Sequence, residues 1–409
     1  MTAGYAARRP SGSRKLGEPH DLGKKMQLRT PSVVAVGPGT SDEVSGYARS
    51  LGITRPIVVS DSYLVEIGLV DRLLPGLRES GLHTVTFHDV ESDPTVKQVD
   101  AGTETAREHE ADGVIAIGGG SPMDVGKAIG AMLGNDGSIE AFAGYDRIPR
   151  DGARVIAVPT TAGSGSEATR AVVITDSDRH IKFPVYDDRL IPTVAVVDHK
   201  LSMGMPQHLT ANVGVDALSH AVEAYVSRLS NPFSDMYALE AIRLISSSLE
   251  RAYEDPENEQ ARWAMMYGAT LAGVAFSNSS IALVHGMSRP LGANFHVAHG
   301  AANAAVMPAI IKFSITAASA PRYGEIARQM GLVVDDVPND EAAAVLPSAL
   351  AELNQRLGVR RLRDYVDSRD AFEDALPAMA QDALDSGSPK YNPRVPNAAD
   401  IVEIYRKAY

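Results

Sequence analysis

Hydrophobic residues in the first half of the chain form short β-branched runs separated by amphipathic stretches. Runs that predict strands are SVVAVG (32–37), PIVVSD (56–61), TVTFHD (84–89), GVIAIGGG (113–120), RVIAVPT (154–160), AVVITD (171–176) and TVAVVD (193–198). Between the first four runs, apolar positions near 41–51, 62–79 and 95–110 have helical spacing. Strands that alternate with helices predict a parallel sheet with helices on both faces.

After Asp198 the apolar positions follow a helical period instead. The segments with this spacing are 209–227, 234–254, 257–276 and 342–358. They predict a mostly helical second domain, with the boundary in DHKLSMGMP (198–206). We therefore divide the chain into an α/β domain, 32–200, and a helical domain, 201–409.

Composition narrows the class of protein. Of 409 residues, 44% are hydrophobic and 22% are charged, as in soluble globular proteins. A net charge of −12 argues against a nucleic-acid partner, and the chain lacks an apolar run of about 18 residues that would span a membrane. There is no cysteine, so a metal must be held by His, Asp, Glu or carbonyl oxygen. We expect a cytoplasmic protein.

The first 31 residues differ in character from the rest. They contain seven Lys or Arg and two acidic residues, and they lack the apolar core of a secretory signal. This composition predicts a disordered basic extension.

A glycine-rich segment, GGGSPMDVGKAIG (118–130), follows the strand GVIAI. Ser121 is expected to cap the next helix, with Pro122 at its first position. Gly118, Gly119 and Gly120 would let a phosphate approach the helix N-terminus closely. The alternative is a plain glycine-rich turn.

Two further segments suggest a nucleotide cofactor. Asp61 ends the second strand, where a carboxylate can accept hydrogen bonds from a ribose diol and repel a 2′-phosphate, which favours NAD over NADP. A helix cap is the alternative role for Asp61. PTTAGSGSEATR (159–170) is a small, hydroxyl-rich loop that suits packing against a cofactor. It does not match GxSxG, so a serine hydrolase is not indicated.

Histidines and a carboxylate suggest a metal site. Asp216 and His220 lie four residues apart on a predicted helix, a spacing that can bind one ion but also occurs in surface pairs. His285 and His299 lie in LVHGMSRPLGANFHVAHG (283–300), whose three glycines and one proline exclude one uninterrupted helix. Three histidines and a carboxylate brought to one point would suit Fe²⁺ or Zn²⁺. A core or surface role is the alternative for each histidine.

In this order, GGGSP, PTTAGSGSE, GVDALSHAVEAY and LVHGMSRPLGANFHVAHG resemble the motifs of the iron-containing (group III) alcohol dehydrogenase family, over residues 32–409. The resemblance implies an N-terminal dinucleotide-binding α/β domain and an all-α C-terminal domain, the dehydroquinate synthase-like fold, with the active site between them. It implies metal-assisted hydride transfer between NAD(H) and a small aldehyde or primary alcohol. It also implies a homodimer or higher homo-oligomer.

The resemblance also assigns residues. The implied metal ligands, for Fe²⁺ or Zn²⁺, are Asp216, His220, His285 and His299. The implied cofactor contacts are Asp61, Gly119, Gly120, Ser121, Thr160, Thr161 and Lys182, with Asp124 supporting the same loop.

One position departs from the family's pattern. Many members have a histidine four residues after the one that matches His285, in HGMxHPLG, and it is thought to relay the alcohol proton; here the residue is Arg289. Arginine stays protonated and cannot be an ordinary general base. His296 is the nearest replacement, with a packing role in the loop as its alternative.

Arg289 suggests a substrate class. A fixed cation near the metal would select an aldehyde that bears a carboxylate, phosphonate or sulfonate. An ion pair within the helical domain is the alternative. Two other functions stay open from the sequence: a dehydroquinate-synthase-like lyase that uses NAD and a metal, and a catalytically impaired protein that binds both.

Overall fold

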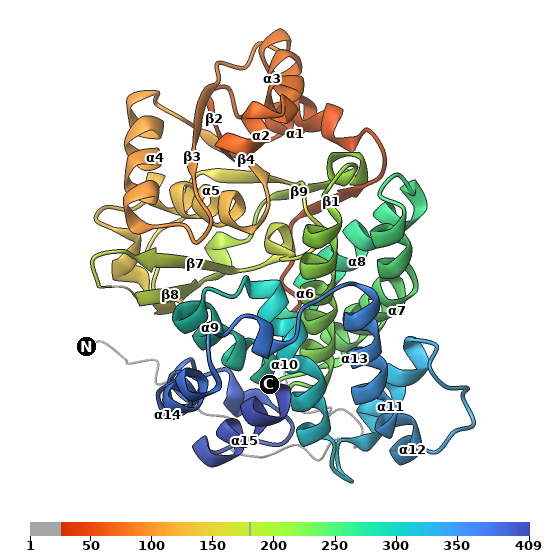
Figure 1. Cartoon of the computed structure of the whole chain (residues 1–409). Helices are drawn as coiled ribbons and strands as arrows, with labels where there is room; N and C mark the ends of the chain where they lie inside the picture. Colours follow the sequence, from red (N-terminus) through yellow and green to blue (C-terminus); the bar gives the residue numbers. More distant parts are fainter. Residues whose placement is uncertain (1–25, 180) are drawn as a thin grey trace.

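The structure, a computed structural model, describes residues 26–179 and 181–409 (Figure 1). Six parallel strands form the main sheet in the order β1-β9-β6-β4-β2-β3. These strands are β1 (Val33–Val36), β2 (Pro56–Asp61), β3 (Val85–Val90), β4 (Gly113–Gly118), β6 (Arg154–Pro159) and β9 (Val194–Val197). The helices between them are α1 (Val44–Ser50), α2 (Ser62–Glu66), α3 (Leu69–Glu79), α4 (Val96–Glu108) and α5 (Gly120–Leu133).

The central strands are hydrophobic on both faces because helices cover both sides of the sheet. Ile57 and Val59 of β2 pack on the face covered by α4 and α5. Val58, between them, packs on the opposite face against α1 and α3. Both layers of helices were predicted from the alternating pattern.

A second, smaller sheet lies on the side of the α/β domain that faces the C-terminal helical domain (Figure 1). Its order is β5-β8-β7, with β7 and β8 antiparallel. The strands are β5 (Gly144–Tyr145), β7 (Ala171–Asp176) and β8 (Ile181–Tyr186). The sequence predicted the strand at 171–176 but not β8, whose IKFPVY has a lysine and a proline among its apolar residues.

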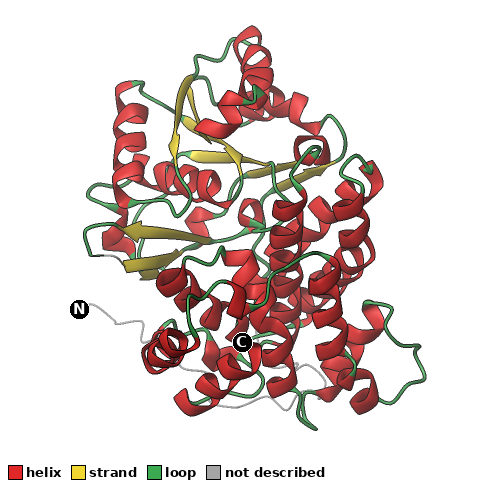
Figure 2. Cartoon of the chain, in the orientation of Figure 1, coloured by secondary structure: helices red, strands yellow, loops and turns green. Residues whose placement is uncertain are grey.

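The second domain is entirely helical, and strands are confined to the first (Figure 2). Its helices are α6 (Gln207–Val226), α7 (Pro232–Glu254), α8 (Glu259–Ser277), α9 (Leu283–Phe295), α10 (His299–Ser314), α11 (Ala320–Gln329), α12 (Asn339–Ala344), α13 (Leu346–Arg356), α14 (Arg369–Asp385) and α15 (Ala398–Ala408). Along α6, every residue from Gly214 to Val226 is buried, so this helix lies in the domain core. None of the helices in 26–179 and 181–409 is long and apolar enough to cross a membrane.

Two segments of the helical domain are each divided into two helices. The predicted interruption in 283–300 is confirmed: α9 ends at Phe295, His296 adopts a left-handed conformation with φ 54°, and α10 begins at His299. The segment 342–358, predicted as one helical stretch, is divided at Val345 into α12 and α13, since Pro347 favours a new helix start.

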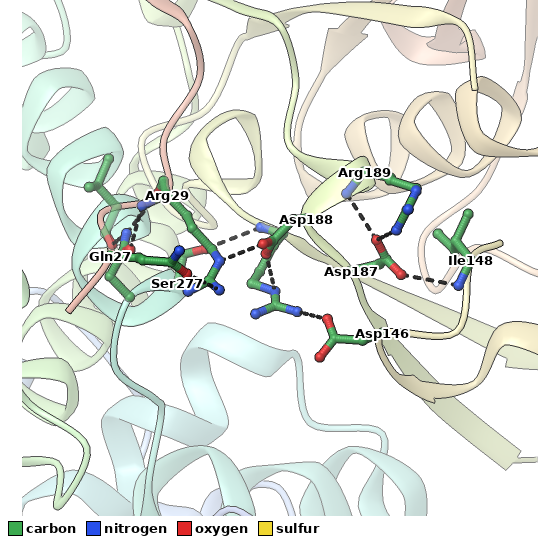
Figure 3. Close-up of polar contacts among 11 residues, drawn as sticks. Gln27, Arg29, Asp146, Ile148, Asp187, Asp188, Arg189 and Ser277 are labelled. Atoms are coloured by element: carbon green, nitrogen blue, oxygen red, sulfur yellow. Dashed lines mark hydrogen bonds and ion pairs between the residues drawn. The ribbon is translucent and has the colours of Figure 1, made fainter. Parts of the chain in front are cut away.

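The segment before β1 joins the two domains (Figure 3). The backbone N–H of Arg29 donates to Asn278 Oδ1 at 2.7 Å, and Asn278 Nδ2 donates to the Arg29 carbonyl at 2.7 Å. The Arg29 side chain pairs with Asp188 at 2.5 Å, and Arg170 pairs with the same carboxylate at 3.1 Å. The Arg170 N–H also donates to Ser277 Oγ in α8 at 3.1 Å. Residues 1–25 of the predicted extension lie outside the described residues.

Candidate active site

Side chains from three helices converge on one point in the helical domain. α6 carries Asp216 and His220, α10 carries His299 and Asn303, and α9 contributes His285 from its first turn. The α6 and α10 pairs are spaced i, i+4, so each pair lies on one helix face.

One oxygen of Asp216 lies between three imidazoles. Oδ1 is 3.9 Å from His220 Nε2, 3.5 Å from His285 Nε2 and 3.7 Å from His299 Nε2. Asp216, His220 and His285 are buried, whereas the His299 side chain is 49% exposed, so the cluster opens to solvent on that side. Ligand bonds of about 2.1 Å place donor atoms about 3 to 3.5 Å apart around a zinc-sized ion. The ligand atoms of Asp216, His220 and His285 lie within 4.8 Å of one another and suit one divalent cation, and His299 lies beside Asp216 on the exposed side of this group.

A buried carboxylate that the sequence reasoning missed orients His285. Glu223 Oε2 lies 2.5 Å from His285 Nδ1, and Glu223 Oε1 accepts the Val284 N–H at 2.5 Å. A carboxylate on Nδ1 turns the other ring nitrogen toward the metal position. Glu223 lies seven residues after Asp216, hence on the same face of α6, and this spacing is the signal that could have found it.

The charges of the cluster suit a cation. Burial lowers the pKa of His220 to about 3, so that this imidazole is neutral. Burial also acts to lower the pKa of His285, but Glu223 and Asp216 outweigh it and raise the value to about 9. A divalent ion would displace the His285 proton and neutralise the nearby carboxylates.

Gly300 allows α10 to reach α6. A Cβ at this position would lie 2.2 Å from the carbonyl oxygen of Asn212 in α6, far inside van der Waals contact. Only glycine permits this approach, which places His299 and Asn303 beside Asp216.

The glycine-rich loop differs in detail from the prediction. β4 ends at Gly118, Gly119 is the N-cap of α5, and the helix begins at Gly120. The expectations that Ser121 caps this helix and that Pro122 is its first residue were wrong, because the glycines let the chain turn earlier. No side chain caps this helix within the described part of the chain, so its first N–H groups can face a ligand.

The two loops with candidate cofactor contacts lie against each other. A Cβ at Gly119 would be 3.3 Å from Thr161 Oγ1, and one at Gly120 would be 3.3 Å from Ser164. The Thr160 N–H donates to the Gly118 carbonyl at 3.0 Å. These residues lie at the carboxyl ends of β4 and β6, the edge where doubly wound sheets bind ligands.

Asp61 and Asp124 both have partners within the chain. Asp61 Oδ1 accepts a hydrogen bond from the Leu64 N–H at 2.8 Å and caps α2. The helix cap, which the sequence offered as the alternative role of Asp61, is therefore present. Asp124 accepts from Ser166 Oγ at 2.6 Å and from the Val173 N–H at 2.8 Å. Asp124 thus fixes the loop after β6 onto α5.

Two cations from different domains act on the electrostatics of His299. Desolvation lowers the pKa of His299, and the charges of Arg289 in α9 and Lys182 in β8 lower it further. Lys182 is paired with Asp93 at 2.5 Å. Arg289 is half-buried and has no hydrogen bond or ion pair with any residue that the structure describes.

His296 lies between α9 and α10, close to the cluster in sequence. It is exposed, and its backbone N–H donates to the Gly292 carbonyl at 3.1 Å. Within 26–179 and 181–409, no hydrogen bond joins its side chain to the four candidate ligands.

The chain matches two family models. "Iron-containing alcohol dehydrogenase" matches residues 31–199, and "Fe-containing alcohol dehydrogenase family, C-terminal" matches residues 210–409. The chain belongs to the iron-containing alcohol dehydrogenase family. A relative, the NAD-dependent methanol dehydrogenase of Bacillus methanolicus, is 35% identical over 92% of this chain and 98% of its own length. The NADPH-dependent butanol dehydrogenase of Clostridium saccharobutylicum is 34% identical over 94% of this chain and 98% of its own length.

Solved structures agree with this iron-containing alcohol dehydrogenase over almost its whole length. A 1,3-propanediol oxidoreductase has a TM-score of 0.91 at 35% identity and covers 94% of this chain and 100% of its own. Sulfoacetaldehyde reductase from Bifidobacterium kashiwanohense, in complex with NAD⁺, has a TM-score of 0.83 at 28% identity, with coverage of 94% and 99%. The enzyme is therefore a metal-dependent, NAD(P)-dependent alcohol dehydrogenase or aldehyde reductase with the predicted fold. This result favours the dehydrogenase over the lyase.

Proposed function

We propose that this enzyme transfers a hydride reversibly between NAD(H) and an aldehyde or primary alcohol that carries an anionic group. Fe²⁺ would be held by Asp216, His220, His285 and His299, and Zn²⁺ suits the same donors. The ion would act as a Lewis acid on the substrate oxygen, with its acidity moderated by the negative charge of Asp216.

Arg289, which has no ion pair among the residues that the structure describes, is the observation that supports the anionic substrate. It lies one helical turn after His285, it is half-buried, and it makes no hydrogen bond or ion pair with an acidic side chain among the described residues. A partly desolvated cation without a counter-charge is unfavourable, and a substrate anion would supply one. The sulfoacetaldehyde reductase indicates that this fold accommodates an aldehyde with a negative group.

Asp61 supports NAD over NADP. It lies at the carboxyl end of β2, next to β4 and its glycine-rich loop. A carboxylate there can bind a ribose diol, and its charge disfavours a 2′-phosphate. We propose that the pyrophosphate lies at Gly119, Gly120 and Ser121, that Thr160, Thr161 and Lys182 contact the cofactor, and that Asp124 supports the loop.

The proton of the alcohol would leave by a different route from that expected for family members with a histidine at the position of Arg289. Arg289 cannot accept it. We propose that His296, exposed at the end of α9, relays the proton to solvent. Homo-oligomerisation and a cytoplasmic location stay predictions.

The test compares substrates in the protein reconstituted anaerobically with Fe²⁺. NADH oxidation is measured with propanal, succinic semialdehyde and phosphonoacetaldehyde, for the wild type, Arg289→Ala and Arg289→Lys. We expect the wild type to prefer the anionic aldehydes. We expect Arg289→Ala to lose roughly 10- to 100-fold in kcat/KM for them, as for a hydrogen bond to a charged group, and Arg289→Lys to lose less.

Activity with propanal should change little in Arg289→Ala. Arg243→Ala, on an exposed part of α7, is the control for loss of a surface arginine. A wild-type enzyme that prefers propanal would contradict the anionic substrate and leave a general alcohol dehydrogenase.

A further inference from the structure

The buried amide of Asn303 lies among the candidate metal ligands without a role in the proposed function. Its side chain is fully buried, at 0% exposure. Its Nδ2 is 2.6 Å from Asp216 Oδ1, 3.4 Å from His285 Nε2 and 3.3 Å from His299 Nε2. This single nitrogen of α10 thus contacts its own helix as well as α6 and α9.

The orientation of this amide is determined by its neighbours. Nδ2 can only donate, and Oδ1 can only accept. A reversed amide would place Oδ1 against the Asp216 carboxylate, two acceptors in contact. In the observed orientation Oδ1 is buried without a hydrogen-bond partner among the described residues, which is unfavourable by itself. We infer that the bond from Nδ2 to Asp216 outweighs this cost.

We propose that Asn303 is a positioning residue of the metal centre, which holds the Asp216 carboxylate between the imidazoles and thereby raises the affinity for the ion. The inference rests on the proposed function for the identity of the ligands. An imidazole nitrogen that binds an ion has no lone pair left for Asn303, whereas a carboxylate can bind an ion and still accept a hydrogen bond. Of the three contacts of Asn303 Nδ2, the hydrogen bond to Asp216 is therefore the one that would persist when the ion is bound.

Position in the fold supports a role at the metal rather than in packing alone. Asn303 follows His299 by one turn of α10, so the same helix face presents a ligand and a hydrogen-bond donor to Asp216. A fixed carboxylate has less rotational freedom to lose when the ion binds. Hydrogen-bond partners of metal ligands commonly change metal affinity when they are replaced.

The experiment measures Zn²⁺ affinity of the metal-stripped full-length protein by competition with a chromophoric chelator. Asn303→Leu removes the donor at similar volume, and Asn303→Ala removes it without any risk of a clash. Asn392→Leu is the matched control: Asn392 is 2% exposed and its amide donates to Ser314 Oγ at 2.9 Å, at the other end of α10. The thermal unfolding temperature of each metal-stripped protein shows whether it is folded.

We expect both Asn303 variants to bind Zn²⁺ about 10- to 100-fold more weakly. Asn392→Leu should keep wild-type affinity while its unfolding temperature falls about as much as that of Asn303→Leu. Wild-type affinity in a folded Asn303→Ala would overturn the proposal and leave the ligand assignment intact. A wild-type protein that binds no Zn²⁺ would overturn the ligand assignment together with this inference.

Discussion

Lys127 is a charged side chain in an almost fully enclosed position. It belongs to α5, and its Nζ donates to the carbonyls of Ser166 and Ala171 at 2.9 and 2.6 Å and to Thr169 Oγ1 at 3.0 Å. These bonds tie the loop after β6 to the helix that follows the glycine-rich loop. Burial lowers the pKa of Lys127 to about 8, against the opposing effect of Asp124 and Glu167.

This pKa predicts a pH dependence of stability. Between about pH 8 and pH 10.4, the unfolded chain binds a proton at this lysine that the folded chain does not. The free energy of unfolding should therefore rise with pH across this window, by up to about 3 kcal/mol, and the lysine should contribute no pH dependence below it. Urea midpoints between pH 7.5 and 10 would show the rise. Lys127→Met should lack it, and the exposed-site variant Lys200→Met should keep it; equal slopes in all three would contradict the assignment.

Among single residues, the sequence predicted the candidate ligands whose side-chain chemistry and spacing can be recognised within one short segment. Asp216 and His220 were found through their separation on one helix. Glu223 and Asn303 were missed because their partners are distant: the Glu223 carboxylate meets a histidine 62 residues later, and Asn303 meets a carboxylate 87 residues earlier. Such contacts depend on which helices pack together. The seven-residue spacing places Glu223 on the face of α6 that carries Asp216, but it does not identify His285 as the partner of Glu223.

At the scale of elements, the approach of α10 to α6 decides whether the cluster exists. The contact occurs at Gly300, where the backbones of the two helices nearly touch. Any side chain at this position must move α10 away and carry His299 with it.

We therefore predict that Gly300→Ala weakens Zn²⁺ binding by at least 10-fold and lowers stability by about 1 to 3 kcal/mol, as overpacking typically does. Gly76→Ala is the matched control, since Gly76 lies within α3 and a Cβ there meets nothing within 4 Å. The control should be neutral or slightly stabilised, because alanine favours helix. Chelator competition and thermal unfolding measure both effects, and wild-type metal affinity in Gly300→Ala would refute the prediction.

Elements with strong periodicity were predictable from the sequence, and their ends were less so. The parallel strands and the long helices α6, α7 and α8 follow from uninterrupted apolar patterns. β8 was missed because lysine and proline disturb its pattern, although pairing with β7 stabilises it. The start of α5 was misplaced because Ser121 and Pro122 imitate a helix start that the preceding glycines bring forward.

At the scale of the whole molecule, polar contacts join the two domains. Asp188 receives two arginines, Arg29 from the segment before β1 and Arg170 from the loop before β7 (Figure 3). Arg29 is also bound to the end of α8 through Asn278. The N-terminal segment is therefore attached to both domains.

Asp188→Asn should loosen this attachment. We expect trypsin to cleave after Arg29 several-fold faster in the variant, as detected by mass spectrometry of the fragment that begins at Thr30, because cleavage requires local release of the segment. Zn²⁺ affinity should not change, since the ligand cluster lies within the helical domain. Asp136→Asn, which removes an exposed ion pair with Arg150, is the control. Equal cleavage rates in the two variants would argue against a role for Asp188.

The proposed metal ligands all belong to the helical domain, whereas the glycine-rich loop and Asp61 belong to the α/β domain. The nicotinamide carbon and the substrate carbon, which exchange the hydride, would thus be held by different domains. They would meet only where the two domains touch. Such an arrangement lets evolution alter each partner of the reaction independently. Nucleotide preference can change without disturbing the ion, and substrate preference can change through α9 without rebuilding the nucleotide loops. One relative of this chain is named an NAD-dependent dehydrogenase and another an NADPH-dependent one, a difference that this independence permits.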